Sequence, residues 1–167
     1  LTPPQQQQFQ QPHNNSGILL ANALKTQNTH AIRQILHAYR DNLDISYIEP
    51  NDGHNLLSLA ILSRQKDVAL HLIRKGINPL IRSLNERHAI YYVSELGSLD
   101  ILIAIFERYP QLDVNMIIAN EPYNYTIIHT ATRHNHGHII EYLAGKEGIE
   151  VNLTEGEYGY TAIMMAV

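Results

Sequence analysis

A short motif recurs along this chain at steps of 33 to 38 residues, and no other feature limits the possible folds as strongly. Thr126 opens the clearest copy, Thr-Ile-Ile-His-Thr-Ala, and Thr161 opens another, Thr-Ala-Ile-Met-Met-Ala. A period in this range is typical of stacked repeats, in which each unit buries an apolar face that it could not bury alone. The small residues that close the successive copies are Ala23, Ala60, Val93, Ala131 and Ala166.

Each repeat contains two short stretches with apolar residues at helical spacing. In the second repeat, Leu57 and Ile61 share one face of the first stretch, and Val68 and Leu72 share one face of the second. Gly76 follows at the position of a helix C-cap. Helices this short are marginal in isolation, so we expect stacking against neighbours to stabilise them.

The pattern divides the chain into a linker and a repeat domain. Residues 1–16 are dominated by Gln, Pro and Asn, which predicts a disordered linker because such a segment has little apolar surface to bury. Residues 17–167 form the repeat domain. Its predicted units lie near residues 17–48, 49–81, 82–116, 120–153 and 155–167, the last truncated after its first helix begins.

These features resemble the ankyrin repeat, whose pattern is Gly-x-Thr-Pro-Leu-His-x-Ala-Ala followed by a second apolar helix and Gly-Ala-Asp-Val-Asn. The fourth unit matches best through Thr126, His129 and Ala131, and the second keeps Gly53 and Gly76. The resemblance implies an all-α solenoid of stacked antiparallel helix pairs with projecting hairpins.

The motif residues have structural roles in this interpretation. We expect the hydroxyls of Thr126 and Thr161 to cap the helices that follow them. The resemblance implies that His129 ties neighbouring loops by hydrogen bonds and that Ala131 lets adjacent helices approach closely. Gly53 suits a turn with positive φ. In the third unit Glu86 replaces this glycine, so we expect its hairpin to deviate more than its helices.

Composition excludes some function classes. The net charge of −4 and the pI near 6.2 argue against a general nucleic-acid binder, which needs a basic field. No apolar run approaches the roughly 20 residues of a membrane span. The chain has no cysteine, which agrees with a reducing, cytoplasmic location. Because it begins with Leu1, we expect that the sequence is a fragment.

Four histidines close together in the sequence invite a metal-site interpretation: His129, His134, His136 and His138. On a helix, residues two apart point to different faces, so we expect structural or solvated histidines and no metal site. The sequence has no nucleophile elbow, phosphate loop or zinc-protease motif, so we predict neither a catalytic residue nor a cofactor.

Residues at the loop tips and on the exposed sides of the first helices are the candidate binding residues. Tyr123 with Tyr125, and Tyr158 with Tyr160, occupy matching tips of consecutive units, and tyrosine is enriched at binding hot spots. The alternative is that these rings pack on each other and only stiffen the hairpins. The full predicted set is Asn51, Asp52, His54, Asn85, Arg87, Glu95, Tyr123, Tyr125, Arg133, His134, Tyr158 and Tyr160.

The favoured function is a non-catalytic module that recruits or positions another protein. An alternative is the targeting or regulatory arm of a larger enzyme whose catalytic domain lies outside this fragment. A third is an oligomerisation or autoinhibitory surface. The eroded repeats resemble ankyrin proteins that intracellular bacteria deliver into host cells, which would place the chain in the host cytosol. The truncated last unit predicts that further chain or another subunit covers its apolar face.

Overall fold

The computed structural model describes residues 14–120 and 122–166, and most of the predicted linker lies outside this part. The described part is mostly helical, which confirms the all-α class. Ser16, which the sequence assigned to the linker, already belongs to the first helix. The helices are α1 Ser16–Lys25, α2 Thr29–Ala38, α3 Leu56–Leu62, α4 Lys66–Arg74, α5 Ala89–Glu95, α6 Leu99–Arg108, α7 Ile127–Arg133, α8 Gly137–Ala144 and α9 Ala162–Met165.

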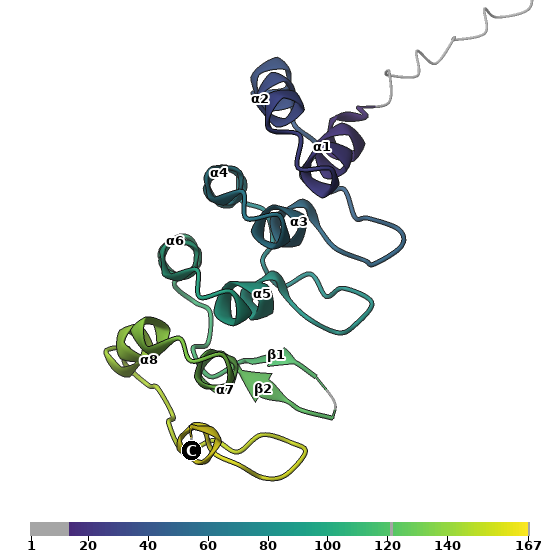
Figure 1. Ribbon diagram of the computed structural model, residues 1–167. Helices are drawn as coiled ribbons and strands as arrows, with labels where there is room; N and C mark the ends of the chain where they lie inside the picture. The colour runs from purple at the N-terminus through teal and green to yellow at the C-terminus, as the bar shows by residue number, and fades with distance from the viewer. Residues whose placement is uncertain (1–13, 121, 167) are drawn as a thin grey trace, which may run out of the picture.

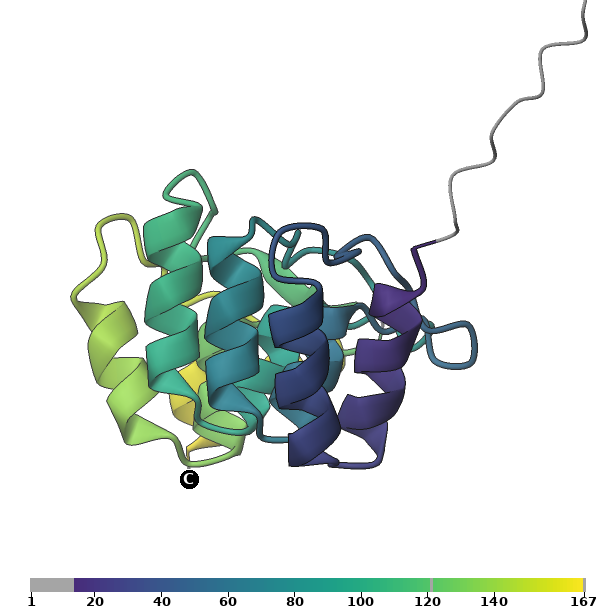
Figure 2. The same ribbon diagram turned by 90° about the horizontal axis from the view of Figure 1, so that it is seen from above.

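The helices form consecutive side-by-side pairs, α1 with α2, α3 with α4, α5 with α6 and α7 with α8 (Figure 1). The first helices make an inner row in which each contacts the next, from α1 through α9. The second helices make an outer row, seen in front when the molecule is viewed from above (Figure 2). The order of the pairs in space therefore follows their order in the sequence.

A left-handed residue makes the tight turn between the two helices of each pair. Gln27, Arg64, Gly97 and Asn135 have φ between 52° and 70°, and each follows the end of a first helix. Such a residue reverses the chain direction after a helix end. Only one of the four is glycine, so the sequence marks these turns weakly.

The inner row forms the core. Every residue of α3 except Leu62 is buried, whereas α2 in the outer row buries only Ile32. Leu57, Ile90 and Ile127, from three successive inner helices, belong to one continuous apolar cluster. The inner helices are therefore enclosed by their neighbours, and the outer helices cover one side of them.

Each inner helix from α3 onward is preceded by a hairpin that projects sideways from the inner row (Figure 1). The fourth hairpin, counted by repeat unit, pairs β1 Ile117–Ala119 with β2 Tyr125–Thr126 in antiparallel register. The second and fifth have single bridges, Ile48 to Asn55 and Thr154 to Thr161.

The tip of each hairpin has a residue with positive φ two positions before the residue that caps the next helix. Gly53 and Gly159 supply it in the second and fifth hairpins, and Asn124 supplies it in the fourth. Glu86 adopts the same conformation, with φ of 58°, in the third. The turn of the third hairpin therefore does not deviate from the turns of the other hairpins. Glu86 adopts the left-handed conformation although this costs a non-glycine residue about 1–2 kcal/mol.

Candidate functional site

Hydrogen bonds from motif residues hold the fourth hairpin in place. Thr126 is the N-cap of α7, and its backbone N–H and its hydroxyl both lie within hydrogen-bonding reach of His129 Nδ1, at 3.3 and 2.9 Å. His129 Nε2 lies 2.9 Å from the carbonyl of Leu153, the last residue of the fourth unit, to which it donates. Burial lowers the pKa of His129 and so favours the neutral imidazole, and the Leu153 carbonyl favours the tautomer with the proton on Nε2. Ala131 is fully buried on the same helix.

In the second unit, Asn55 alone both caps the helix and forms the hydrogen bond to a backbone carbonyl. Asn55 caps α3 by accepting from Ser58 N–H at 2.9 Å, and its amide donates to the Asn78 carbonyl at 2.9 Å. Thr161 caps α9 more weakly, with its hydroxyl 3.4 Å from Met164 N. Gly76 follows α4 with φ of 87° and reverses the chain after that helix.

Two buried glutamates, which the sequence interpretation missed, fix the tips of the second and fifth hairpins. Glu155 is 4% exposed and accepts from the backbone N–H groups of Glu157, Tyr158 and Tyr160 at 2.7 to 2.9 Å. Glu49 accepts in the same way from two backbone amides and also from Lys25 Nζ at 3.1 Å. Each glutamate stands six residues before a helix cap, a shared spacing that could have revealed them.

The fourth and fifth hairpins carry two stacked tyrosine pairs. Tyr123 and Tyr125 have ring centroids 5.2 Å apart, and Tyr158 and Tyr160 are 5.6 Å apart. The second pair is open to solvent, with Tyr158 66% and Tyr160 48% exposed. Gly156 N–H donates to the Tyr123 carbonyl at 2.6 Å, so the two hairpins are joined by their backbones. The rings of each pair pack on each other, and one pair still leaves a large surface free.

Two arginines lie beside the tyrosines. Arg87 places its guanidinium carbon 4.3 Å from the centroid of the Tyr91 ring, and Arg133 donates to the Tyr125 hydroxyl at 3.0 Å. The Tyr91 hydroxyl donates to Glu95 Oε1 at 3.2 Å. Tyr91 is not among the binding residues predicted from the sequence. Its spacing of four from Glu95 could have placed both on one face of α5.

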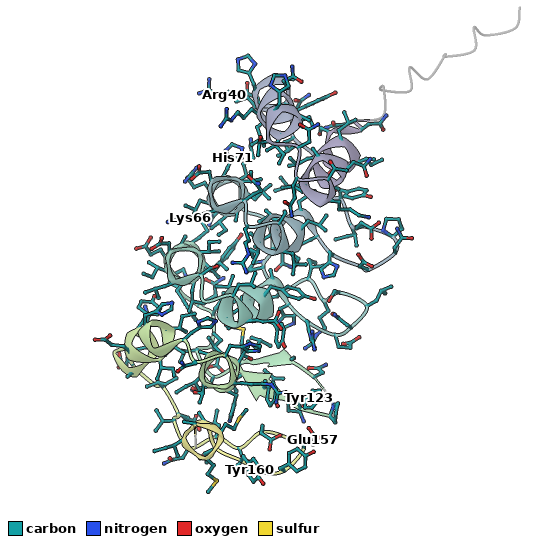
Figure 3. The ribbon with its side chains drawn as sticks, viewed as in Figure 1. Arg40, Lys66, His71, Tyr123, Glu157 and Tyr160 are labelled. Carbon is teal, nitrogen blue, oxygen red and sulfur yellow. The ribbon has the colours of Figure 1, made fainter. Side chains whose placement is uncertain are left out.

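A small cavity of about 90 Å³ lies where these side chains converge. The buried rings of Tyr91 and Tyr125 form part of its wall. Its lining residues are Arg87, Tyr91, Ala119, Tyr123, Tyr125 and Arg133. Together with Glu95, Tyr158 and Tyr160, we call these residues the tyrosine–arginine surface. In Figure 3, Tyr123 and Tyr160 lie on the hairpin side, and Arg40, His71 and Lys66 lie on the opposite side.

The structure places the other predicted residues differently. His54 is only 8% exposed, and its Nε2 lies 2.9 Å from the Tyr92 hydroxyl, which donates to Asn85 Oδ1 at 3.2 Å. The prediction of an open tip position for His54 is therefore wrong, because Tyr92 of the next unit reaches under the hairpin. Asn51 and Asp52 are exposed on the second hairpin, and neither lines the cavity of the tyrosine–arginine surface.

Three histidines form a row that the sequence argument had ruled out. The rings of His134 and His136 are 6.4 Å apart, and those of His136 and His138 are 5.7 Å apart. Continuous helical geometry would point the three rings in different directions. Instead, Asn135 has φ of 58° and turns the chain between α7 and α8. His136 and His138 donate from Nε2 to the carbonyls of the preceding unit, at 2.8 and 2.9 Å. Across the described residues, no group of three or more His, Cys, Asp or Glu has the arrangement of a metal site.

Within the part of the chain that the structure describes, no helix is long and apolar enough to cross a membrane. Comparison of the sequence with models of known protein families gave no match, and comparison with curated proteins gave none either. The candidate site therefore rests on the sequence and the geometry described above.

Proposed function

We propose that this chain is a non-catalytic, ankyrin-type repeat module that binds another protein through the tyrosine–arginine surface. The observation that carries the proposal is the convergence of exposed and half-buried tyrosines with two arginines across three consecutive units. Tyrosine and arginine are the residue types that dominate binding energy in protein interfaces, together with tryptophan.

Support for the ankyrin type comes from the repeat geometry. Inner and outer helices alternate in sequence order, and a hairpin precedes each inner helix from the second unit onward. Thr126 and His129 make a helix cap and a hydrogen bond to the Leu153 carbonyl, where the chain leads into the fifth hairpin, which are contacts of the kind that the motif implies. An array of this kind presents a long surface made of its hairpins and inner helices.

Support for binding comes from two exposed tyrosines on a hairpin whose backbone is held in place by hydrogen bonds. Tyr158 and Tyr160 stack on each other in the open, while Glu155 holds the backbone beneath them through their own N–H groups. A preorganised aromatic pair loses little conformational entropy when a partner covers it. We therefore expect the fifth hairpin to contribute a large part of the binding energy.

The test is selection of binding peptides from a random library displayed on phage, with the full chain immobilised. Peptides selected by the unchanged protein are expected to bind the Tyr158→Ala, Tyr160→Ala variant at least about 30-fold more weakly, since loss of a hot spot costs about 2 kcal/mol. The control is Arg40→Ala on the opposite side, where binding should not change. Equal binding to all three proteins would refute the proposed surface.

A further inference from the structure

We propose that the cavity between Arg87 and Arg133 receives a carboxylate group of the partner polypeptide. This inference rests on the proposed function and adds the chemistry of the partner. It assigns the arginines to recognition of an anion and the tyrosines to the walls that surround it.

Both guanidinium groups have donors left for a ligand. Neither Arg87 nor Arg133 has a carboxylate within 4.0 Å among the described residues. Arg133 donates to one phenol oxygen, and Arg87 has a ring contact with Tyr91. A guanidinium has five N–H donors in a planar fork that matches the two oxygens of a carboxylate. The cavity thus offers more donors than the described residues accept.

The local charges favour an anion at this point. Among the described residues, two guanidinium groups line the cavity beside the carboxylate of Glu95, which already accepts from the Tyr91 hydroxyl and lies 3.9 Å from His134 Nε2. The carboxylates of Glu155 and Glu157 act on Tyr125 from the next hairpin. Burial first, and Glu95 second, raise the pKa of Tyr91 to about 12, so its hydroxyl keeps the proton that it donates. Glu155 on the next hairpin is occupied by three backbone N–H groups.

The size of the cavity selects a single small group. A volume of about 90 Å³ corresponds to about three water molecules, and drug-sized ligands need about 300 Å³ or more. A cationic side chain is disfavoured, because two like charges line the cavity and Arg87 already covers the Tyr91 ring. A carboxylate fits both the volume and the charge.

The experiment compares retention of matched peptide libraries on the immobilised chain. Each library has a fixed central residue in random flanks that exclude aspartate and glutamate: glutamate with an amidated C-terminus, glutamine with a free C-terminus, glutamine with an amidated C-terminus, and trimethyl-lysine with an amidated C-terminus. We expect the first or the second library to be retained about tenfold more than the third. Each of the first two supplies a carboxylate where the third has only an amide. The first two libraries distinguish a side-chain carboxylate from a chain terminus.

The variants assign the effect to the two arginines. In the Arg87→Gln, Arg133→Gln variant the tenfold preference should fall to about one, and in Arg40→Gln it should stay. If the double variant does not fold, the exposed Arg133→Gln alone should lower the preference at least threefold. Equal retention of the first three libraries, preference for trimethyl-lysine, or a carboxylate preference that survives in the folded variants would overturn the proposal. If selected peptides depend on Tyr158 and Tyr160 without a carboxylate preference, only the carboxylate inference fails.

Discussion

The second and fifth hairpins have the same framework but different tips. In both, a buried glutamate accepts backbone N–H groups from the tip, a glycine has φ near 70°, and a cap residue starts the next helix. The second carries Asn51 and Asp52 at its tip and buries His54, whereas the fifth exposes Tyr158 and Tyr160. The comparison teaches that the framework of a hairpin can be kept while its tip is adapted to contact a neighbouring unit or solvent.

The largest expected difference between these hairpins concerns their turn glycines. A Cβ at Gly53 would come within 2.8 Å of the Leu84 backbone nitrogen, whereas a Cβ at Gly159 would meet nothing within 4 Å. Gly53→Ala should therefore lower the free energy of unfolding by about 3 kcal/mol, combining left-handed strain with a backbone clash. Gly159→Ala should cost about 1 kcal/mol, from strain alone. Urea unfolding of both variants measures this, and equal losses would contradict the comparison.

The cap residues should differ less. Asn55→Ala removes a cap and the hydrogen bond to the Asn78 carbonyl, so we expect a loss of about 2 kcal/mol. Thr161→Ala removes one long cap bond and should cost about 0.5–1 kcal/mol. Thermal unfolding at matched concentrations compares the two. Asn55→Asp keeps the cap acceptor but places a buried carboxylate oxygen against the Asn78 carbonyl, so its loss should be at least as large as that of Asn55→Ala.

Acid should weaken the second hairpin, because burial lowers the pKa of His54, with Asp52 acting in the opposite direction. Between this lowered pKa and the ordinary value of 6.5, the unfolded chain binds more protons than the folded one. Stability from a neutral His54 is therefore present above pH 6.5 and is lost as the pH falls through the lowered pKa. Urea unfolding at pH 8 and pH 5 should show a smaller loss for His54→Asn than for the unchanged protein. An identical loss would show that other groups, such as His129, account for the whole effect.

The smallest effect is expected at the third hairpin, where Glu86 occupies the turn position that glycine has in the second and fifth. Glu86→Gly should raise the free energy of unfolding by about 0.5–1 kcal/mol through relief of left-handed strain, reduced by the greater freedom of glycine in the unfolded chain. The control is Glu86→Ala, which removes the carboxylate near Arg82 but keeps the strain. If both variants change stability equally, strain at Glu86 is not the cause.

The sequence predicted what repeats and missed what is local to one unit. The helical stretches followed from apolar spacing, as with Leu57 and Val68, because burial enforces that spacing in every unit. The all-α class followed from the resemblance of the repeats to a known family. The burial of His54 could not be predicted, since it depends on a contact with Tyr92 of the next unit. The histidine row depended on the left-handed conformation of Asn135, which is not glycine and carries little signal.

The backbone bond between Gly156 and Tyr123 has a consequence for how a partner could approach. A Cβ at Gly156 would come within 2.7 Å of the Pro122 carbonyl oxygen and 2.6 Å of the side-chain amide nitrogen of Asn124. The fourth and fifth hairpins therefore approach each other too closely at this point for a side chain at position 156. The main chain at this contact thus fixes the separation of the two hairpins that carry the tyrosine pairs. A partner of the proposed kind would have to match that separation, and a larger side chain at position 156 should change it without contacting any of the four rings.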